Sequence, residues 1–166
     1  MKSNKAFTLI EILVVVLIIG ILATIAVPEY QKAVAKAELS QIISLTRTIK
    51  EAEATYYLAH NKFGKISDLD ISINNPNITC NIESDTYIYC GNKNFSILYY
   101  LTAHHSECWI NTLDKNSSLA YACKDFLNNQ SSSFSTTERE RSINACQKRF
   151  PTTTSKCLNF NGTANF

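Results

Sequence analysis

One long apolar segment near the N-terminus constrains the fold of this chain more than any other feature. It runs from Phe7 to Val27 and carries a single charge, that of Glu11. A helix of this length crosses the hydrocarbon core of a bilayer, and two lysines ahead of it favour a cytoplasmic N-terminus. A carboxylate at the centre of a spanning helix costs about 2.5 to 3.5 kcal/mol, so we expect Glu11 to have an assigned partner. The segment is therefore predicted to span a membrane.

An ordinary secretory signal peptide is the simplest alternative for the same segment. Thr24 and Ala26 are small enough to form a cleavage site after Ala26. The segment is longer than the roughly 7 to 15 apolar residues of a signal peptide, and the charge of Glu11 also argues against that interpretation. A second alternative is that Glu11 has no partner and only reaches the headgroups from near the end of the helix.

A second helical pattern follows the apolar segment directly. Residues 29–60 carry an apolar stripe at spacings of three, four and seven, with charged residues around it. Joined to the apolar segment, this stripe predicts one helix of about 80 Å, which must project from a domain of this size. We expect bends or partial melting at Gly20 and Pro28, and the end of the helix within 61–64. The stripe consists of Ala35, Ile42, Leu45, Ile49, Ala52, Tyr56 and Ala59.

Beyond Gly64 the apolar pattern changes to period two, which indicates β-strands. We predict a four-stranded antiparallel meander covered by the amphipathic helix, and hence an α+β fold. The box Thr137-x-x-Glu140 predicts a short helix at 137–150. The predicted strands are 86–90, 95–101, 107–113 and 119–123, with turn residues between them.

Six cysteines all lie in the C-terminal half of the chain, which indicates disulfides and an oxidising compartment. Their spacings do not match the close pairs of structural zinc sites, so we expect no metal. They are Cys80, Cys90, Cys108, Cys123, Cys146 and Cys157.

Turn positions predict how these cysteines pair, because residues that face each other across a hairpin are symmetric about its turn. The midpoint of Cys108 and Cys123 falls within the turn-rich stretch 114–117, which favours that pair. Cys90 with Cys108 would instead centre on Tyr99, inside a predicted strand. The predicted pairs are Cys80 with Cys90, Cys108 with Cys123, and Cys146 with Cys157.

The sequence Lys5-Ala6-Phe7-Thr8-Leu9-Ile10-Glu11 resembles the leader-cleavage motif of type IV prepilins and the related pseudopilins. The resemblance extends through the apolar segment, where Gly20 and Pro28 stand at positions at which that family commonly carries Gly and Pro. It implies that a membrane prepilin peptidase cuts between Ala6 and Phe7, and that the new amine of Phe7 is N-methylated. The family usually has Gly before the cut bond, so Ala6 is a departure from its pattern.

The resemblance also implies a role for Glu11, which would be the fifth residue of the mature chain. In the family this carboxylate is thought to meet the terminal ammonium of a neighbouring subunit, and such a pair supplies axial register. The implied partners are identical or related pilin subunits, the prepilin peptidase, the pilus assembly machinery of the inner membrane, and membrane lipid before assembly. The precursor is expected in a bacterial inner membrane with its C-terminal domain outside the cytoplasm, and the mature chain in an extracellular filament.

The expected organisation is a leader at 1–6, a transmembrane and assembly helix at 7–28, its amphipathic continuation at 29–60, and a globular domain at 61–166 with a disulfide-bonded C-terminal region. We predict a structural subunit of a type IV pilus that serves adhesion, twitching motility or DNA uptake, and not an enzyme. The cluster of His104-His105 with Glu107 and Cys108 is a weak candidate for catalysis, because Cys108 has a disulfide partner. We therefore expect no catalytic residue and no cofactor.

Two alternative functions remain open. A pseudopilin of a type II secretion system would share the whole N-terminal pattern, although six cysteines and the absence of a tight acidic cluster favour a pilus. A minor pilin would instead capture DNA or a receptor, and DNA has little support because 16 basic residues are nearly matched by 14 acidic ones. A basic stripe for DNA would consist of Lys124, Arg139, Arg141, Lys148, Arg149 and Lys156.

Overall fold

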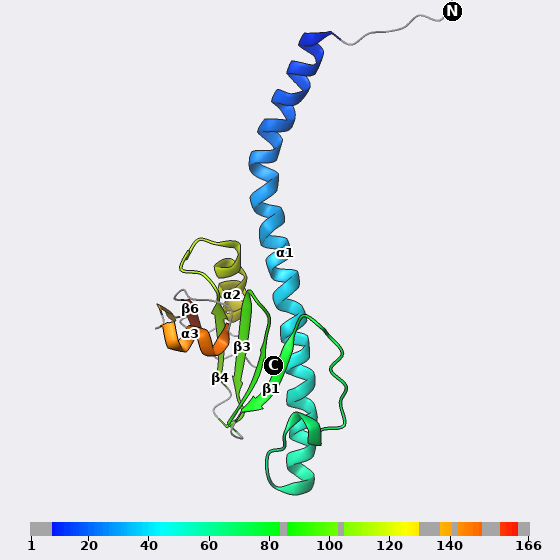
Figure 1. Cartoon of the computed structure of the whole chain (residues 1–166), viewed down its shortest axis with the longest axis vertical. Coiled ribbons are helices and arrows are strands. Elements are labelled where there is room, and N and C mark those ends of the chain that lie inside the picture. The colour runs from blue at the N-terminus through cyan, green and yellow to red at the C-terminus, as the bar shows by residue number, and fades with distance from the viewer. Residues whose placement is uncertain are drawn as a thin grey trace, which may run out of the picture.

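A long helix carries a β-sheet on its C-terminal half, and its other half projects away from the sheet (Figure 1). The computed structural model describes residues 8–83, 86–102, 105–129, 137–140, 143–150 and 157–162. The predicted cleavage and methylation residues, Ala6 and Phe7, lie outside the described residues, as does His104.

The helix α1 runs from Leu9 to His60, so the prediction of one helix that ends at residues 61–64 is confirmed. Its first turn is closed by a capping box between Thr8 and Glu11. Its last turn is closed by Asn61, whose φ of 53° places it in the left-handed region that Asn tolerates. The 52 residues correspond to about 78 Å at 1.5 Å per residue.

The helix continues without a break through both residues at which we expected bends or melting. Gly20 and Pro28 lie inside α1, and Figure 1 shows only a gentle curve along the helix. A proline in a helix removes one backbone hydrogen bond, yet α1 remains helical on both sides of Pro28. The isolated subunit therefore shows no melting at Gly20 or Pro28.

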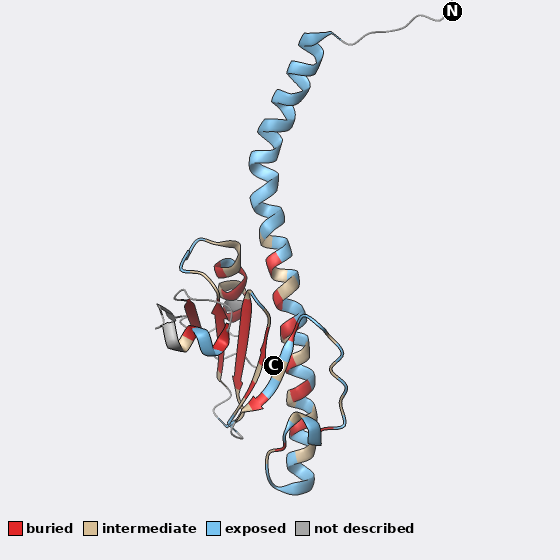
Figure 2. Ribbon diagram, in the orientation of Figure 1, coloured by how far each residue is buried: buried red, intermediate tan, exposed pale blue. Residues whose placement is uncertain are grey.

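Only the second half of α1 is buried against the domain (Figure 2). Its buried positions recur every three or four residues, as expected for one face of a helix. Among the predicted stripe residues, Ala35, Ile42 and Ile49 are buried, and Ala59 is exposed. The predicted residues Leu45, Ala52 and Tyr56 are partly buried against the core. The buried residues of α1 are Ala35, Leu39, Ile42, Thr46, Ile49 and Glu53.

The sheet has six strands, so the predicted α+β class is confirmed and the predicted count of four strands is wrong. All neighbouring strands are antiparallel, in the order β1-β2-β3-β4-β6-β5. The strands are β1 (Thr79–Glu83), β2 (Tyr87–Gly91), β3 (Phe95–Tyr100), β4 (His105–Ile110), β5 (Thr137–Glu140) and β6 (Leu158–Gly162). Three of them, β2, β3 and β4, match the first three predicted strands.

The predicted fourth strand, 119–123, is instead part of the helix α2 (Ser118–Asn129). The side chains of Ala120, Cys123 and Leu127 are buried at spacings of three and four, which is helical spacing. The hydroxyl oxygen of Ser117 accepts a hydrogen bond from the backbone N–H of Ala120 at 3.2 Å, as an N-cap residue does. An apolar run of five residues is too short to distinguish the two periods.

The predicted helix at 137–150 is also wrong in its first part. Residues 137–140 form β5, which pairs with β6, and only Ile143–Arg149 forms a helix, α3. The local capping-box pattern is overridden because β6 offers a partner strand that is distant in sequence. Strand β1 was also missed, as was the short 3-10 helix at Ile66–Asp68.

Two apolar clusters cover the two faces of the sheet. On the inner face, buried residues of α1, α2 and the strands form the main core. On the outer face, Leu98 and Trp109 pack against Phe150 and the half-cystines Cys146 and Cys157. The helices α1 and α2 therefore cover one face, and α3 with its disulfide covers the other.

Three disulfides are present, with the same pairing that turn symmetry predicts. Cys80 and Cys90 are direct partners across β1 and β2, and Cys146 bonds to Cys157 beside β6. The bond between Cys108 and Cys123 joins β4 to α2. The reason given for that pair is thus wrong, since the bond does not cross a hairpin.

Candidate functional site

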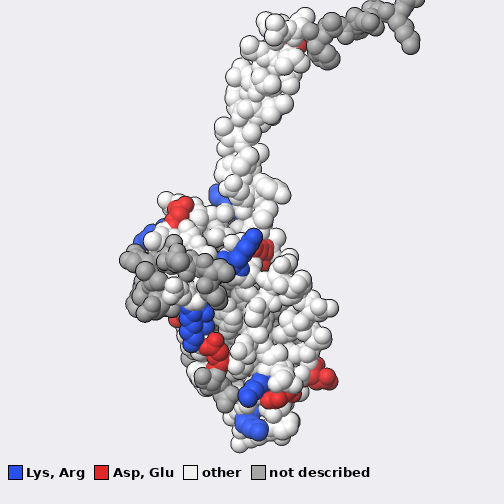
Figure 3. All heavy atoms as spheres, in the orientation of Figure 1, with Lys and Arg blue, Asp and Glu red and all other residues white. Residues whose placement is uncertain are grey.

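The first half of α1 is the most unusual surface of the molecule. Every residue from 8 to 31, here called the exposed half-helix, is exposed, including Leu9 at 92% and Ile25 at 67%. Among the described helices, α1 is the one that is long and apolar enough to cross a membrane. Figure 3 shows this half almost free of charged atoms, which gather on the domain. A surface of this kind must be covered by lipid or by protein.

Glu11 lies in the first turn of the exposed half-helix. One oxygen of its carboxylate, Oε2, accepts from the backbone N–H of Thr8 at 2.7 Å and from the Thr8 hydroxyl at 2.8 Å. The backbone N–H of Glu11 donates to the Thr8 hydroxyl oxygen at 3.3 Å. Among the described residues, no lysine or arginine forms an ion pair with Glu11. The geometry leaves an exposed carboxylate that a cation from another molecule can reach.

Gly20 has no packing role inside this subunit. A Cβ atom built at Gly20 meets nothing within 4 Å. A small residue on an apolar helix lets a second helix approach its backbone closely. Gly20, like Glu11, therefore lies on an exposed surface that a second helix can approach.

The domain is fixed to α1 by polar contacts that sequence reasoning missed. The carboxylate of Glu38 on α1 accepts from the side-chain amides of Asn92 at 2.7 Å and Asn94 at 3.0 Å, in the turn between β2 and β3. Lys36 on α1 forms an ion pair of 2.9 Å with Asp125 on α2, and this partner raises the pKa of Lys36. The sequence offered no more than an Asn-rich turn at 92–94 and, far from it along the chain, an acidic residue in the predicted amphipathic helix.

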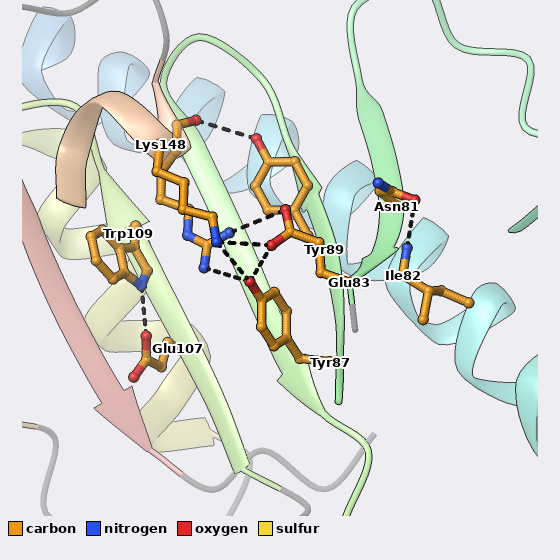
Figure 4. A network of polar contacts seen from close by, with 9 residues as sticks. Asn81, Ile82, Glu83, Tyr87, Tyr89, Glu107, Trp109 and Lys148 are labelled. Carbon is orange, nitrogen blue, oxygen red and sulfur yellow. Dashed lines mark hydrogen bonds and ion pairs between the residues drawn. The ribbon is translucent and has the colours of Figure 1, made fainter. Parts of the chain in front are cut away.

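A second polar network joins α3 to the outer face of the sheet (Figure 4). The hydroxyl of Tyr87 donates to the carboxylate of Glu83, which also forms an ion pair of 3.1 Å with Lys148. The hydrogen bond from Tyr87, helped by Lys148, holds the pKa of Glu83 below its ordinary value, although partial burial opposes the shift. Arg149 donates to the Tyr87 hydroxyl oxygen at 3.2 Å, and its guanidinium lies 5.7 Å from the ring of Trp109. These contacts hold the disulfide-bonded region in place.

The described members of the proposed basic stripe do not form one surface. Lys124 is on α2, which packs on the inner face, whereas Lys148 and Arg149 are on α3, on the outer face. Arg149 is buried, and Lys148 is paired with Glu83. The side chains of the remaining three members, Arg139, Arg141 and Lys156, lie outside the description of the structure.

Glu107 and Cys108, two members of the weak candidate cluster for catalysis, make structural contacts. Cys108 is disulfide-bonded. The carboxylate of Glu107 accepts from the indole N–H of Trp109 at 2.7 Å and from the amide of Asn159 at 3.1 Å. The described residues contain no group of three or more His, Cys, Asp or Glu side chains arranged to hold a metal ion.

Comparisons with known proteins agree with the N-terminal pattern. Residues 1–27 match the family model described as the prokaryotic N-terminal methylation motif. The chain is 34% identical over 123 residues to a type IV major fimbrial protein of Dichelobacter nodosus, a match that covers 72% of this chain and 78% of that protein.

Other relatives match over a shorter part of this chain. A type IV major pilin protein of Neisseria gonorrhoeae is 48% identical over 60 residues, 36% of each chain. A fimbrial protein of Neisseria meningitidis serogroup B is 46% identical over 60 residues, 36% of this chain and 35% of that protein. The match spans about a third of the length of these neisserial relatives. No solved structure matches the chain at a significant level.

Proposed function

Because this chain belongs to the type IV pilin family, we propose that it is a structural, non-catalytic subunit that polymerises into an extracellular type IV pilus. The observation that carries the proposal is the exposed half-helix, an apolar surface with one carboxylate that projects from a folded domain. The relatives described as major pilins and major fimbrial proteins support a role as the major subunit.

Two environments cover the exposed half-helix in turn. Before assembly, residues 7–28 span the inner membrane, with residues 29–60 and the domain at 61–166 outside the cytoplasm. During assembly, the helices of identical or related subunits replace the lipid. The apolar surface thus remains covered throughout, and the helix interface of the filament replaces the helix–lipid interface.

Processing prepares the N-terminus for assembly. The prepilin peptidase removes the leader 1–6 by cutting between Ala6 and Phe7, and the amine of Phe7 is then methylated. The match to the methylation motif over residues 1–27 supports this step. The peptidase and the assembly machinery of the inner membrane are the partners of the precursor.

Glu11 pairs with the terminal ammonium of Phe7 of a neighbouring subunit. The accessible carboxylate of Glu11, for which no described residue supplies a cation, supports this pairing. A buried ion pair acts mainly as a register device, because an unpaired charge in an apolar bundle is strongly disfavoured. We also propose that the helix melts near Gly20 and Pro28 only when subunits pack together, since it is continuous in the isolated subunit.

Intact-mass spectrometry of purified filaments tests this proposal. We expect a subunit that begins at Phe7 and carries one added methyl group. Immunogold labelling along the whole filament is expected for a major subunit, whereas labelling confined to a few positions would indicate a minor one. A first residue of Met1 or Val27 in assembled filaments would contradict the proposal.

A further inference from the structure

Apolar and aromatic side chains remain exposed where the exposed half-helix meets the domain. Tyr30 is 71% exposed, and Leu113 and Tyr121 are 45% and 44% exposed. Leu113 lies in the loop before α2, and Figure 1 shows that loop at the end of the domain nearest the N-terminal half of α1. These three residues are here called the interfacial patch.

Contacts with α1 fix the level of the patch along the helix. The ring of Tyr121 lies 5.2 Å from the ammonium of Lys32 and 5.0 Å from that of Lys36. Tyr30 lines a groove of about 240 Å³ together with Ser118 at the start of α2. Tyr30 and Tyr121 therefore lie where α1 leaves the domain, and the loop that carries Leu113 lies at the same end of the domain.

Tyr30 lies at the level of the headgroup layer of a bilayer, and Lys32 and Lys36, which contact Tyr121, lie about 8 to 14 Å beyond Val27. If the hydrocarbon region ends near Val27, Tyr30 lies about 4.5 Å beyond it at 1.5 Å per residue. Each headgroup layer is about 5 to 8 Å thick, and Tyr is enriched there because its ring is apolar and its hydroxyl is polar. A modest tilt of the helix toward the domain brings Leu113 and Tyr121 into the same layer.

We propose that the interfacial patch binds the phospholipid headgroup layer and holds the domain of the membrane-bound precursor against the outer surface of the membrane. This inference rests on the proposed membrane span of residues 7–28. The contact sets the tilt of α1, and it is broken when the subunit leaves the membrane for the filament. The partner is the lipid surface itself, since the patch continues directly from the spanning segment.

The charged residues beside the patch form ion pairs, which indicates that the patch is attracted to the membrane by apolar contacts and not by electrostatics. Lys32 is paired with Glu29 at 2.7 Å, and Lys36 with Asp125 at 2.9 Å. Two neutral pairs leave little net charge to attract anionic lipid. The contact is therefore independent of the anionic lipid content and of moderate salt.

Site-specific photo-crosslinking of the full chain in lipid nanodiscs tests this proposal. The photoreactive residue p-benzoylphenylalanine replaces Leu113 or Tyr121. One control position is Leu17, 58% exposed within the spanning segment, and the other is Leu58, 86% exposed at the far end of α1. We expect lipid adducts at 17, 113 and 121 and at least tenfold fewer at 58, with equal yields in phosphatidylcholine alone and with added phosphatidylglycerol.

The possible outcomes are distinguishable. Adducts at 17, with no more at 113 and 121 than at 58, would overturn the inference and leave the membrane span intact. Crosslinks at 113 and 121 to a second copy in place of lipid would also overturn it. Yields that rise with phosphatidylglycerol would contradict the apolar nature of the contact. An absence of adducts at 17 would refute the span, and with it the proposed function.

Discussion

The carboxylate of Glu11 is held at the start of α1 by local hydrogen bonds. In the isolated subunit its carboxylate closes the first turn of α1 by accepting two hydrogen bonds from Thr8. The same group is exposed and has no basic partner among the residues that the structure describes. The capping box keeps the carboxylate at a defined height on the helix, where a charge from a neighbouring subunit can reach it.

Replacing this carboxylate is expected to impair assembly without harming the precursor. In Glu11→Val, filaments fall at least tenfold, while the membrane-bound subunit stays at the wild-type level or rises, because loss of the charge eases insertion. Electron microscopy of filaments and immunoblots of membranes measure the two effects. Glu29→Gln, which removes a carboxylate just beyond the spanning segment, is the control and should assemble normally. Normal filaments from Glu11→Val would leave this residue without an assembly role.

Glu83 is the second residue whose environment predicts a measurable effect. Its folded-state pKa is held below the ordinary value of 4.5 by Tyr87 and Lys148. A lowered pKa contributes stability that is fully present above the ordinary value and is lost as the pH falls through the folded value. Glu83→Gln should therefore lower the free energy of unfolding by about 1 kcal/mol at pH 7, a figure reduced for partial exposure.

Urea denaturation of the detergent-solubilised chain at several pH values measures this difference. The difference in the free energy of unfolding between wild type and Glu83→Gln should shrink to zero as the pH falls below 4.5, the ordinary pKa of the Glu83 carboxyl. Glu51→Gln, at an exposed position on α1, should not change the unfolding midpoint. A gap that stays constant down to strongly acidic pH would argue against the ionised form of Glu83 as the source of the stability.

At the scale of elements, the second half of α1 organises the domain through one apolar face and one polar contact. The apolar face buries residues at spacings of three and four against the sheet. In the polar contact, the carboxylate of Glu38 accepts hydrogen bonds from the side-chain amides of Asn92 and Asn94 in the β2–β3 turn. The turn thus has a defined position on the helix, and the register of β2 and β3 relative to α1 follows from it.

Removing this contact should loosen the turn selectively. Glu38→Ala leaves two partly buried amides without their acceptor, which we expect to lower the free energy of unfolding by about 2 kcal/mol. Hydrogen exchange should also speed up at residues 91–95 more than in α2. Glu51→Ala, on the same helix and exposed, is the matched control. Equal exchange rates in the turn of wild type and Glu38→Ala would show that the apolar face alone positions it.

At the scale of the whole molecule, the three disulfides join three different pairs of elements. The Cys80–Cys90 bond lies between the edge strand β1 and β2, which already pair through the backbone. The Cys108–Cys123 bond joins β4 to α2 inside the main core, where both half-cystines are fully buried. The Cys146–Cys157 bond holds α3 to the segment that enters β6.

These positions predict a ranking of stability losses. Replacing Cys108 and Cys123 together with Ala should lower the free energy of unfolding by about 3 kcal/mol, because the bond closes a loop of 15 residues and its removal also disturbs the core. Replacing Cys80 and Cys90 should cost less, since the loop is 10 residues and the strands remain paired. Thermal unfolding of both variants measures the order. Peptide mapping without reduction checks the pairing itself, and a Cys90 to Cys108 peptide would contradict it.

Patterns that are local in sequence determined the N-terminal half of this protein. The long helix, its end near Asn61 and its apolar stripe could all be read from the sequence, because an apolar run and a helical period depend only on neighbouring residues. The N-terminal methylation motif was equally readable, since it lies in one continuous stretch. The cut after Ala6 and the assembly role of Glu11 stay predictions. Strands β2, β3 and β4 were predicted for the same reason, as each follows its partner after a short turn.

Only the tertiary structure decided the rest. Residues 119–123 form a helix because α1 and the sheet bury one of its faces, a contact that a five-residue pattern does not report. Residues 137–140 form a strand because β6 pairs with them, and β6 in turn pairs with β4 across some 50 residues of sequence. The Glu38 and Glu83 contacts join residues whose separation is set by the fold. Each of these features depends on the meeting of distant segments, and their meeting is decided by the packing of the whole molecule.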